Sequence, residues 1–316
     1  TGRYLKEMLL DQPQKILALE MGGKNFAVVM DDADLEQALS EVINGAFLTT
    51  GQRCTATSRL LVHEKIYHRF KNALVSAVKE LKPCAANESG MFGPLATKTA
   101  LKKFMAALKI AKNEGAEVLV ESVELGGGAF VTPSIYEVKS SHPMKNYLGE
   151  ELFGPNLCLE SFTDLDQAIN RINQSPYGLS NAIFTFDKDH QERLFFECKS
   201  GILNINRSTN NAYGQMPFGG VNKSGNQRPA GIDAVRYASF PVAVTSLAYG
   251  ESGSFKKPEL KDETPLSVIT LRHQIEKCFE LYGVYSDNAA LDRIAFSQAS
   301  FLGFPQKERF FDELKK

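Results

Sequence analysis

The stretch FAVVMDDADLEQALSEVINGAFLTTGQRC, from Phe26 to Cys54, joins a short apolar run to one long amphipathic pattern. The run at 26–30 is typical of a strand. It is followed by aspartates at 31 and 32, a residue type that caps helices well, and then by apolar residues at helical spacing over 35–47. Gly51 suits a helix end because glycine adopts a left-handed conformation without strain. The stretch predicts a strand, a helix with one buried face, and Cys54 in an exposed turn.

The same alternation of short apolar runs and amphipathic segments continues over about 250 residues. It predicts an α/β domain with a largely parallel sheet. Strands are expected at 16–19, 59–63, 117–120, 156–161, 182–186 and 201–205, and helices at 65–81, 98–113, 165–172 and 188–198. The polar, glycine-rich segment 206–231 is too long for a simple connection, so we expect a loop that binds something. Residues 250–254, GESGS, are typical of a linker.

Composition and charge limit the classes of protein. The 316 residues are 43% hydrophobic and 23% charged, which indicates a globular protein rather than a disordered one. With 36 basic and 37 acidic residues the net charge is -1, so no overall field attracts nucleic acid or an anionic membrane. Because no apolar run is long enough for a membrane helix or a signal peptide, we expect a cytoplasmic protein. Five scattered cysteines and five histidines show no metal-ligand spacing, so no metal site is expected.

Three short segments carry residue types suited to catalysis: LEMGGKN at 19–25, GQRCT at 51–55 and EELFGP at 150–155. A single cysteine such as Cys54 is either a small buried hydrophobe or an accessible thiol. In its polar, glycine-bounded turn, Arg53 is expected to favour the reactive thiolate. Glu20 follows a predicted strand and precedes a glycine turn. Its carboxylate either points into a cleft or is simply solvated.

Taken together, these segments resemble the aldehyde dehydrogenase superfamily. The resemblance runs from Gly2 to about Ser246 and includes SPYGLSNAIFT at 175–185 and MPFGGVNKSGNQRP at 216–229. The separation of 34 residues between Glu20 and Cys54 matches the family's spacing between general base and nucleophile. Within the superfamily, ILALEMGGKN, GQRCT and SGNQRP are most similar to the N-succinylglutamate 5-semialdehyde dehydrogenases of bacterial arginine catabolism.

The resemblance implies an NAD-dependent oxidation of a semialdehyde. Cys54 would form a thiohemiacetal and then a thioester, and Glu20 would activate the water that hydrolyses the thioester. Glu151 and Phe153 match positions that contact the ribose and ring of the nicotinamide, and Gly2 matches the last glycine of a phosphate-binding turn. The resemblance also favours NAD over NADP and implies a homodimer or homotetramer.

Substrate binding is predicted for three further residues. Phe218 matches an aromatic position of the family's substrate tunnel, although an anchor for the loop is the alternative. A succinylated glutamate semialdehyde carries two carboxylates, so guanidinium groups should bind it, and Arg228 and Arg53 are the candidates. An ordinary surface salt bridge is the alternative for Arg228.

The predicted domain organisation starts with a remnant of an NAD-binding domain at 1–23. The catalytic domain covers 24–236, an oligomerisation strand covers 237–250, and 251–316 form a C-terminal extension of unknown role. Because the family's oxyanion asparagine would precede Thr1, we expect this chain alone to be nearly inactive. The alternatives are a catalytically inactive fragment or partner-binding module, a dehydrogenase for another semialdehyde, and an acylating dehydrogenase that uses Cys54 without Glu20.

Overall fold

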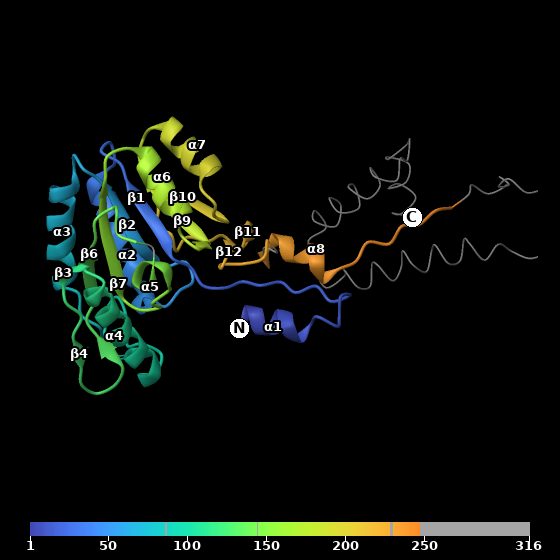
Figure 1. Cartoon of the computed structure of the whole chain (residues 1–316), viewed down its shortest axis with the longest axis horizontal. Coiled ribbons are helices and arrows are strands. Elements are labelled where there is room, and N and C mark those ends of the chain that lie inside the picture. The colour runs from blue at the N-terminus through green and yellow to red at the C-terminus, as the bar shows by residue number, and fades with distance from the viewer. Residues whose placement is uncertain (86, 144, 228–229, 247–316) are drawn as a thin grey trace, which may run out of the picture. The chain divides into compact units, whose positions relative to one another are not determined.

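A computed structural model describes residues 1–85, 87–143, 145–227 and 230–246 (Figure 1). The chain divides into two units, Thr1–Val242 and Ala243–Lys316, and nearly all of the described residues belong to the first. The predicted linker, the predicted extension at 251–316 and Arg228 lie outside the described residues.

The first unit is built on a seven-stranded sheet whose order is β10-β9-β1-β2-β7-β6-β3. Five of the six neighbouring pairs are parallel, and only the edge strand β3 pairs antiparallel, with β6. The predicted α/β fold with a largely parallel sheet is confirmed. The strands are β1 (Asn25–Val29), β2 (Thr57–His63), β3 (Glu117–Val120), β6 (Ser134–Glu137), β7 (Asn156–Phe162), β9 (Ser180–Phe184) and β10 (Ile202–Ile205).

Helices cover both faces of this sheet, as Figure 1 shows. One face packs against α2 (Leu35–Phe47) and α3 (Tyr67–Lys79). The opposite face packs against α4 (Lys98–Asn113), α5 (Asn146–Gly149), α6 (Leu165–Asn173) and α7 (Lys188–Glu197). The short helical elements are α1 (Gly2–Met8), η1 (Leu48–Gly51), η2 (Ile232–Ala234) and α8 (Val235–Ala238). Three antiparallel pairs of two-residue strands lie outside the main sheet: β4 (Glu124–Leu125) with β5 (Phe130–Val131), β8 (Tyr177–Gly178) with β12 (Val221–Asn222), and β11 (Pro217–Phe218) with β13 (Ala230–Gly231).

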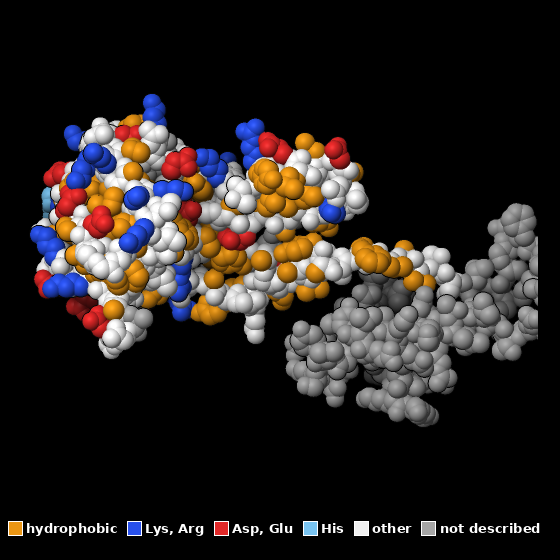
Figure 2. All heavy atoms as spheres, turned by 90° about the horizontal axis from the view of Figure 1, so that it is seen from below, with side chains coloured by type: hydrophobic (Ala, Val, Ile, Leu, Met, Phe, Trp, Pro, Cys, Tyr) orange, Lys and Arg blue, Asp and Glu red, His pale blue; other side chains and the backbone are white. Residues whose placement is uncertain are grey.

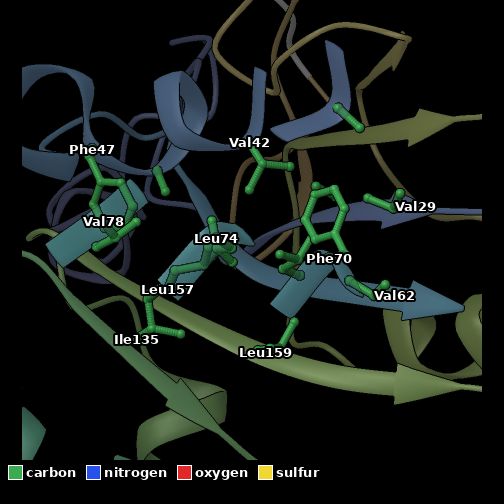
Figure 3. Packing of buried hydrophobic residues seen from close by; sticks show 14 of the residues in the cluster. Val29, Val42, Phe47, Val62, Phe70, Leu74, Val78, Ile135, Leu157 and Leu159 are labelled. Atoms are coloured by element: carbon green, nitrogen blue, oxygen red, sulfur yellow. The ribbon is translucent and has the colours of Figure 1, made fainter. Parts of the chain in front are cut away.

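The core follows from the alternation of side chains along each strand. Val29, Val62 and Leu159 point toward α2 and α3, where Figure 3 shows them beside Val42 and Phe70. Val28, Met30 and Leu61 point the other way, against α6 and α7. Strands buried on both faces require continuous apolar runs, which is why the sequence pattern identified most of them.

Two local predictions near β1 are wrong. The carboxylate of Asp34 caps α2, accepting the backbone N–H groups of residues 36 and 37. Of the two expected caps, Asp32 instead accepts the Thr185 hydroxyl at 2.8 Å and two backbone N–H groups after β9. Asp32 therefore ties together the ends of two adjacent strands, a contact between residues far apart in sequence.

The predicted strand at 16–19 is also absent. The Asn226 side chain provides hydrogen bonds to this segment's backbone instead. It accepts the Leu19 N–H at 3.0 Å and donates to the Leu17 carbonyl at 2.6 Å. The next residue, Glu20, forms an isolated antiparallel bridge with Gly225.

The C-terminal part of the first unit is less regular. Residues 239–246 have no strand partner among the described residues, so the oligomerisation strand predicted at 237–250 stays a prediction. None of the described helices is long and apolar enough to cross a membrane. Lysine, arginine and acidic side chains are interspersed over the face shown in Figure 2.

Candidate active site

The three sequence segments meet at one edge of the sheet because each directly precedes a strand. Residues 20–24 lead into β1, 51–56 into β2 and 150–155 into β7. These strands are adjacent and parallel, so their amino ends lie side by side. Ligands of open α/β sheets generally bind at the carboxyl ends of strands, so this site occupies the opposite edge.

The Cys54 turn depends on an unusual end to α2. The helix ends at Phe47, earlier than the predicted Gly51, and the chain continues through η1 with Thr49 and Thr50 at φ of 55° and 60°. Such left-handed conformations cost free energy for threonine and persist only where surrounding contacts hold them. Gly51 is also left-handed, and a Cβ there would lie 2.4 Å from the Gly154 carbonyl oxygen. This close approach joins the Cys54 turn to the segment that leads into β7.

The Cys54 thiol is half-buried and lies near the carboxylates of Glu20 and Glu151. Burial, followed by the charges of Glu20 and Glu151, raises the pKa of Cys54 to about 11. The prediction that Arg53 favours the thiolate is therefore wrong, since the surroundings favour the neutral thiol. The Arg53 Nε donates instead to the Thr49 hydroxyl at 3.1 Å. The structure thus brings together Cys54, Glu20 and Glu151.

The two glycines after Met21 make room for Glu151. The Gly23 N–H donates to the Glu151 carboxylate at 3.0 Å, and a Cβ on Gly22 would lie 2.1 Å from the other carboxylate oxygen. Burial raises the pKa of Glu151, while the Gly23 hydrogen bond and the charge of Lys24 act in the opposite direction. The Gly22–Gly23 pair therefore leaves space for the Glu151 carboxylate and binds it. The predicted glycine turn did not include this role.

Lys24 is a component that sequence reasoning missed. Its side chain is only 3% exposed, and its ammonium lies 5.2 Å from the centre of the Tyr147 ring. Burial, with the nearby charge of Arg59, lowers the pKa of Lys24 to about 7. Its place directly before the apolar run at 26–30 was the available signal.

The other predicted residues lie around this centre in different settings. Phe153 has a left-handed φ of 53° and is 47% exposed, a conformation that is strained for a bulky residue. Gly2 is buried at the start of α1, where a Cβ would lie 2.5 Å from the Met21 sulfur. Phe218 is half-buried on β11, outside the main sheet.

Part of the predicted binding loop supports the site from outside the sheet. The Met21 N–H donates to the Ser224 carbonyl at 3.0 Å, next to the bridge between Glu20 and Gly225. The Lys223 ammonium lies 3.0 Å from the Glu150 carboxylate, one residue before Glu151. The loop thus contacts both segments that provide the carboxylates.

The fold and this site define the class as an α/β protein with a cysteine and two glutamates at the amino edge of its sheet. The model of the aldehyde dehydrogenase family matches residues 1–240. The chain belongs to the aldehyde dehydrogenase family, as the sequence motifs predicted.

Individual relatives are similar over about three quarters of the chain. An N-succinylglutamate 5-semialdehyde dehydrogenase of Enterobacter sp. (strain 638) is 36% identical over 247 residues, which are 77% of this chain and 49% of that protein. The structure of betaine aldehyde dehydrogenase from Staphylococcus aureus in complex with NAD+ is 30% identical, with a TM-score of 0.70 over 74% of this chain and 47% of that one. Glyceraldehyde-3-phosphate dehydrogenase GapN from Methanocaldococcus jannaschii, complexed with NADP, is 30% identical, with a TM-score of 0.67 over 75% of this chain and 50% of that one. The chain spans about half the length of the relatives it matches.

Proposed function

We propose that the protein oxidises a semialdehyde with NAD+, with N-succinylglutamate 5-semialdehyde as its substrate and Cys54 as its nucleophile. The observation that carries the proposal is that the turn of Cys54 and the segments of Glu20 and Glu151 meet, with the Gly23 N–H bonded to Glu151, the Asn25 amide bonded to the Cys54 carbonyl, and both carboxylates close enough to act on the thiol. The similarity to an N-succinylglutamate 5-semialdehyde dehydrogenase supports the choice of substrate.

The residues around Cys54 fit the nicotinamide end of a dinucleotide. One oxygen of Glu151 accepts the Gly23 N–H, and a carboxylate held in this way has acceptor capacity left for ribose hydroxyls. The exposed ring of Phe153 offers an apolar surface for the nicotinamide. Bound NAD+ supplies the acceptor for the hydride that leaves the substrate carbon.

The chemistry assigned to this chain's own residues has two parts. The Cys54 thiol gives its proton to solvent, and its sulfur adds as a thiolate to the aldehyde carbon. The backbone N–H of Cys54 is a donor for the oxyanion that forms on the former carbonyl oxygen. After oxidation, the substrate is a thioester on Cys54. Glu20 accepts a proton from a water that attacks the thioester carbon, and the carbon–sulfur bond breaks to release the acid and the thiol.

The test is capture of the aldehyde by Cys54, which does not require turnover. We expect N-succinylglutamate 5-semialdehyde to slow the reaction of Cys54 with a disulfide reagent, as measured by peptide mapping. A Cys54→Ala variant controls for labelling elsewhere. If the aldehyde at saturating concentration leaves the Cys54 rate unchanged, the proposed function is wrong.

Arg53 is proposed to bind a carboxylate of the substrate, and its exposed side chain is consistent with this role. We expect Arg53→Ala to weaken protection of Cys54 by the succinylated aldehyde but not by an uncharged aldehyde of similar length. Equal loss of protection with both aldehydes would contradict carboxylate binding. Arg228 and Phe218 remain proposed substrate contacts.

We further propose that the protein acts in the cytoplasm as a homodimer or homotetramer and that residues 237–250 contribute to the contact between subunits. Light scattering of the purified protein tests the oligomer, and a monomer at micromolar concentration would contradict it.

A further inference from the structure

The Cys54 turn is held by hydrogen bonds to its backbone carbonyls. The donors are side chains from two segments that are distant in sequence. The Asn25 amide donates both of its hydrogens, one to the Cys54 carbonyl and one to the Ala56 carbonyl, each at 2.8 Å. The Thr209 hydroxyl donates to the carbonyl between them, that of Thr55, at 2.6 Å. Three consecutive carbonyls of the turn are therefore fixed by side chains rather than by a strand or helix.

The two donors are themselves connected through Ser180. The Ser180 N–H donates to the Asn25 side-chain oxygen at 3.0 Å, and the Ser180 hydroxyl donates to the Thr209 carbonyl at 2.7 Å. Because the Thr209 hydrogen is used on Thr55, the Thr57 hydroxyl is the donor in its 2.7 Å contact with Thr209. The result is a closed ring of hydrogen bonds around the turn.

This ring is shielded from water. Asn25 is 2% exposed, and Thr209 and Ser180 are fully buried. A buried hydrogen bond that loses one partner leaves a desolvated polar group, so each member strongly favours the same arrangement of the others. Such satisfied networks select one backbone conformation.

We propose that Asn25 and Thr209 are positioning residues that hold the Cys54 turn in the conformation that keeps the thiol half-buried against Glu20. The inference rests on the proposed role of Cys54 as nucleophile. It also assigns a role to the start of the loop at 206–231, which the sequence predicted to bind a ligand. Thr209 and Asn210, at the start of this loop, bond to Thr55 in the Cys54 turn.

The direction of the effect follows from the surroundings of the thiol. In the held turn, burial and the carboxylates of Glu20 and Glu151 oppose the thiolate. A released turn exposes the thiol to water, and its pKa moves from about 11 toward the ordinary value of about 8.5. A lower pKa gives more thiolate at neutral pH, but each thiolate is less nucleophilic. The net expectation is that Cys54 reacts about 5- to 20-fold faster with a disulfide reagent.

The experiment compares Thr209→Val with Thr209→Ser in the full chain. Both conserve approximate size, but only serine keeps the hydroxyl. Thr209→Val is expected to accelerate reaction of Cys54 with dithiodipyridine and to shift its pH profile downward, while Thr209→Ser stays within about twofold of wild type. Asn25→Leu, which loses the amide donors without adding a charge, should act in the same direction as Thr209→Val.

Thr185→Val is the matched control for lost stability. Thr185 is also fully buried, but its hydroxyl donates to Asp32 at the opposite end of the sheet. It should lower the melting temperature and leave the Cys54 rate unchanged. The proposal is overturned if Thr209→Val leaves the Cys54 rate within twofold of wild type well below melting, or if Thr185→Val changes it equally. Because thiol reactivity is measured without aldehyde, the proposed function can fail in its own test while this result stands.

Discussion

Replacement of Glu20 by glutamine tests how the site controls its thiol. The pKa of Cys54 is raised to about 11, with burial as the largest cause and the charge of Glu20 next. In contact at an effective dielectric constant of about 20, two like charges repel by up to about 4 kcal/mol. Because Glu20 is exposed, solvent screens most of this repulsion, and we take the remaining effect as about 1.4 kcal/mol, which corresponds to a change of about 1 in pKa. We expect Glu20→Gln to lower the pKa of Cys54 by that amount.

The assay is the rate of reaction with dithiodipyridine between pH 7 and 10. A lower pKa gives about tenfold more thiolate, but nucleophilicity falls with a Brønsted coefficient near 0.5, so the net increase is about threefold. Cys84, which is half-buried and remote in sequence, serves as the internal control and should not change. A slower or unchanged rate in Glu20→Gln would refute the idea that this carboxylate opposes the thiolate.

Three further predictions test the packing and charge of the site and sheet. Gly23→Ala places a Cβ 2.2 Å from the Cys54 carbonyl oxygen and should cost about 1–3 kcal/mol in urea unfolding, whereas Gly126→Ala, with open space around it, should change stability by less than about 0.5 kcal/mol. The pKa of Lys24 is about 7 in the folded protein and about 10.4 in the unfolded chain. Between these pH values the unfolded chain binds more protons, so the free energy of unfolding rises with pH by up to about 1.4 kcal/mol per pH unit. Lys24→Met should abolish this pH dependence, measured by urea unfolding at several pH values. Glu160 is fully buried between two guanidinium groups, and Glu160→Gln should lower the free energy of unfolding by about 3–5 kcal/mol, measured with the same denaturant.

Elements with a local, repeated sequence signal are predicted correctly from the residues. Helix α4 matches the predicted range 98–113 at both ends, because sixteen residues of periodic pattern follow a threonine that caps the first turn. Strands β1, β2 and β7 agree within two residues, since burial on both faces requires continuous apolar runs. The motifs around Glu20, Cys54 and Glu151 likewise identified the family before any contact was known.

Features that depend on contacts between residues far apart in sequence could be known only from the tertiary structure. The segment at 16–19 has the composition of a strand, yet Asn226 satisfies its backbone from more than 200 residues away. Strand β6, only four residues long, is part of the sheet because β7 and β3 pair with it on either side. The charge state of Cys54 was predicted wrongly from its neighbour Arg53, because a pKa depends on burial and on charges nearby in space. Local pattern fixes which elements form, whereas desolvation and long-range hydrogen bonds fix how the chemical groups behave.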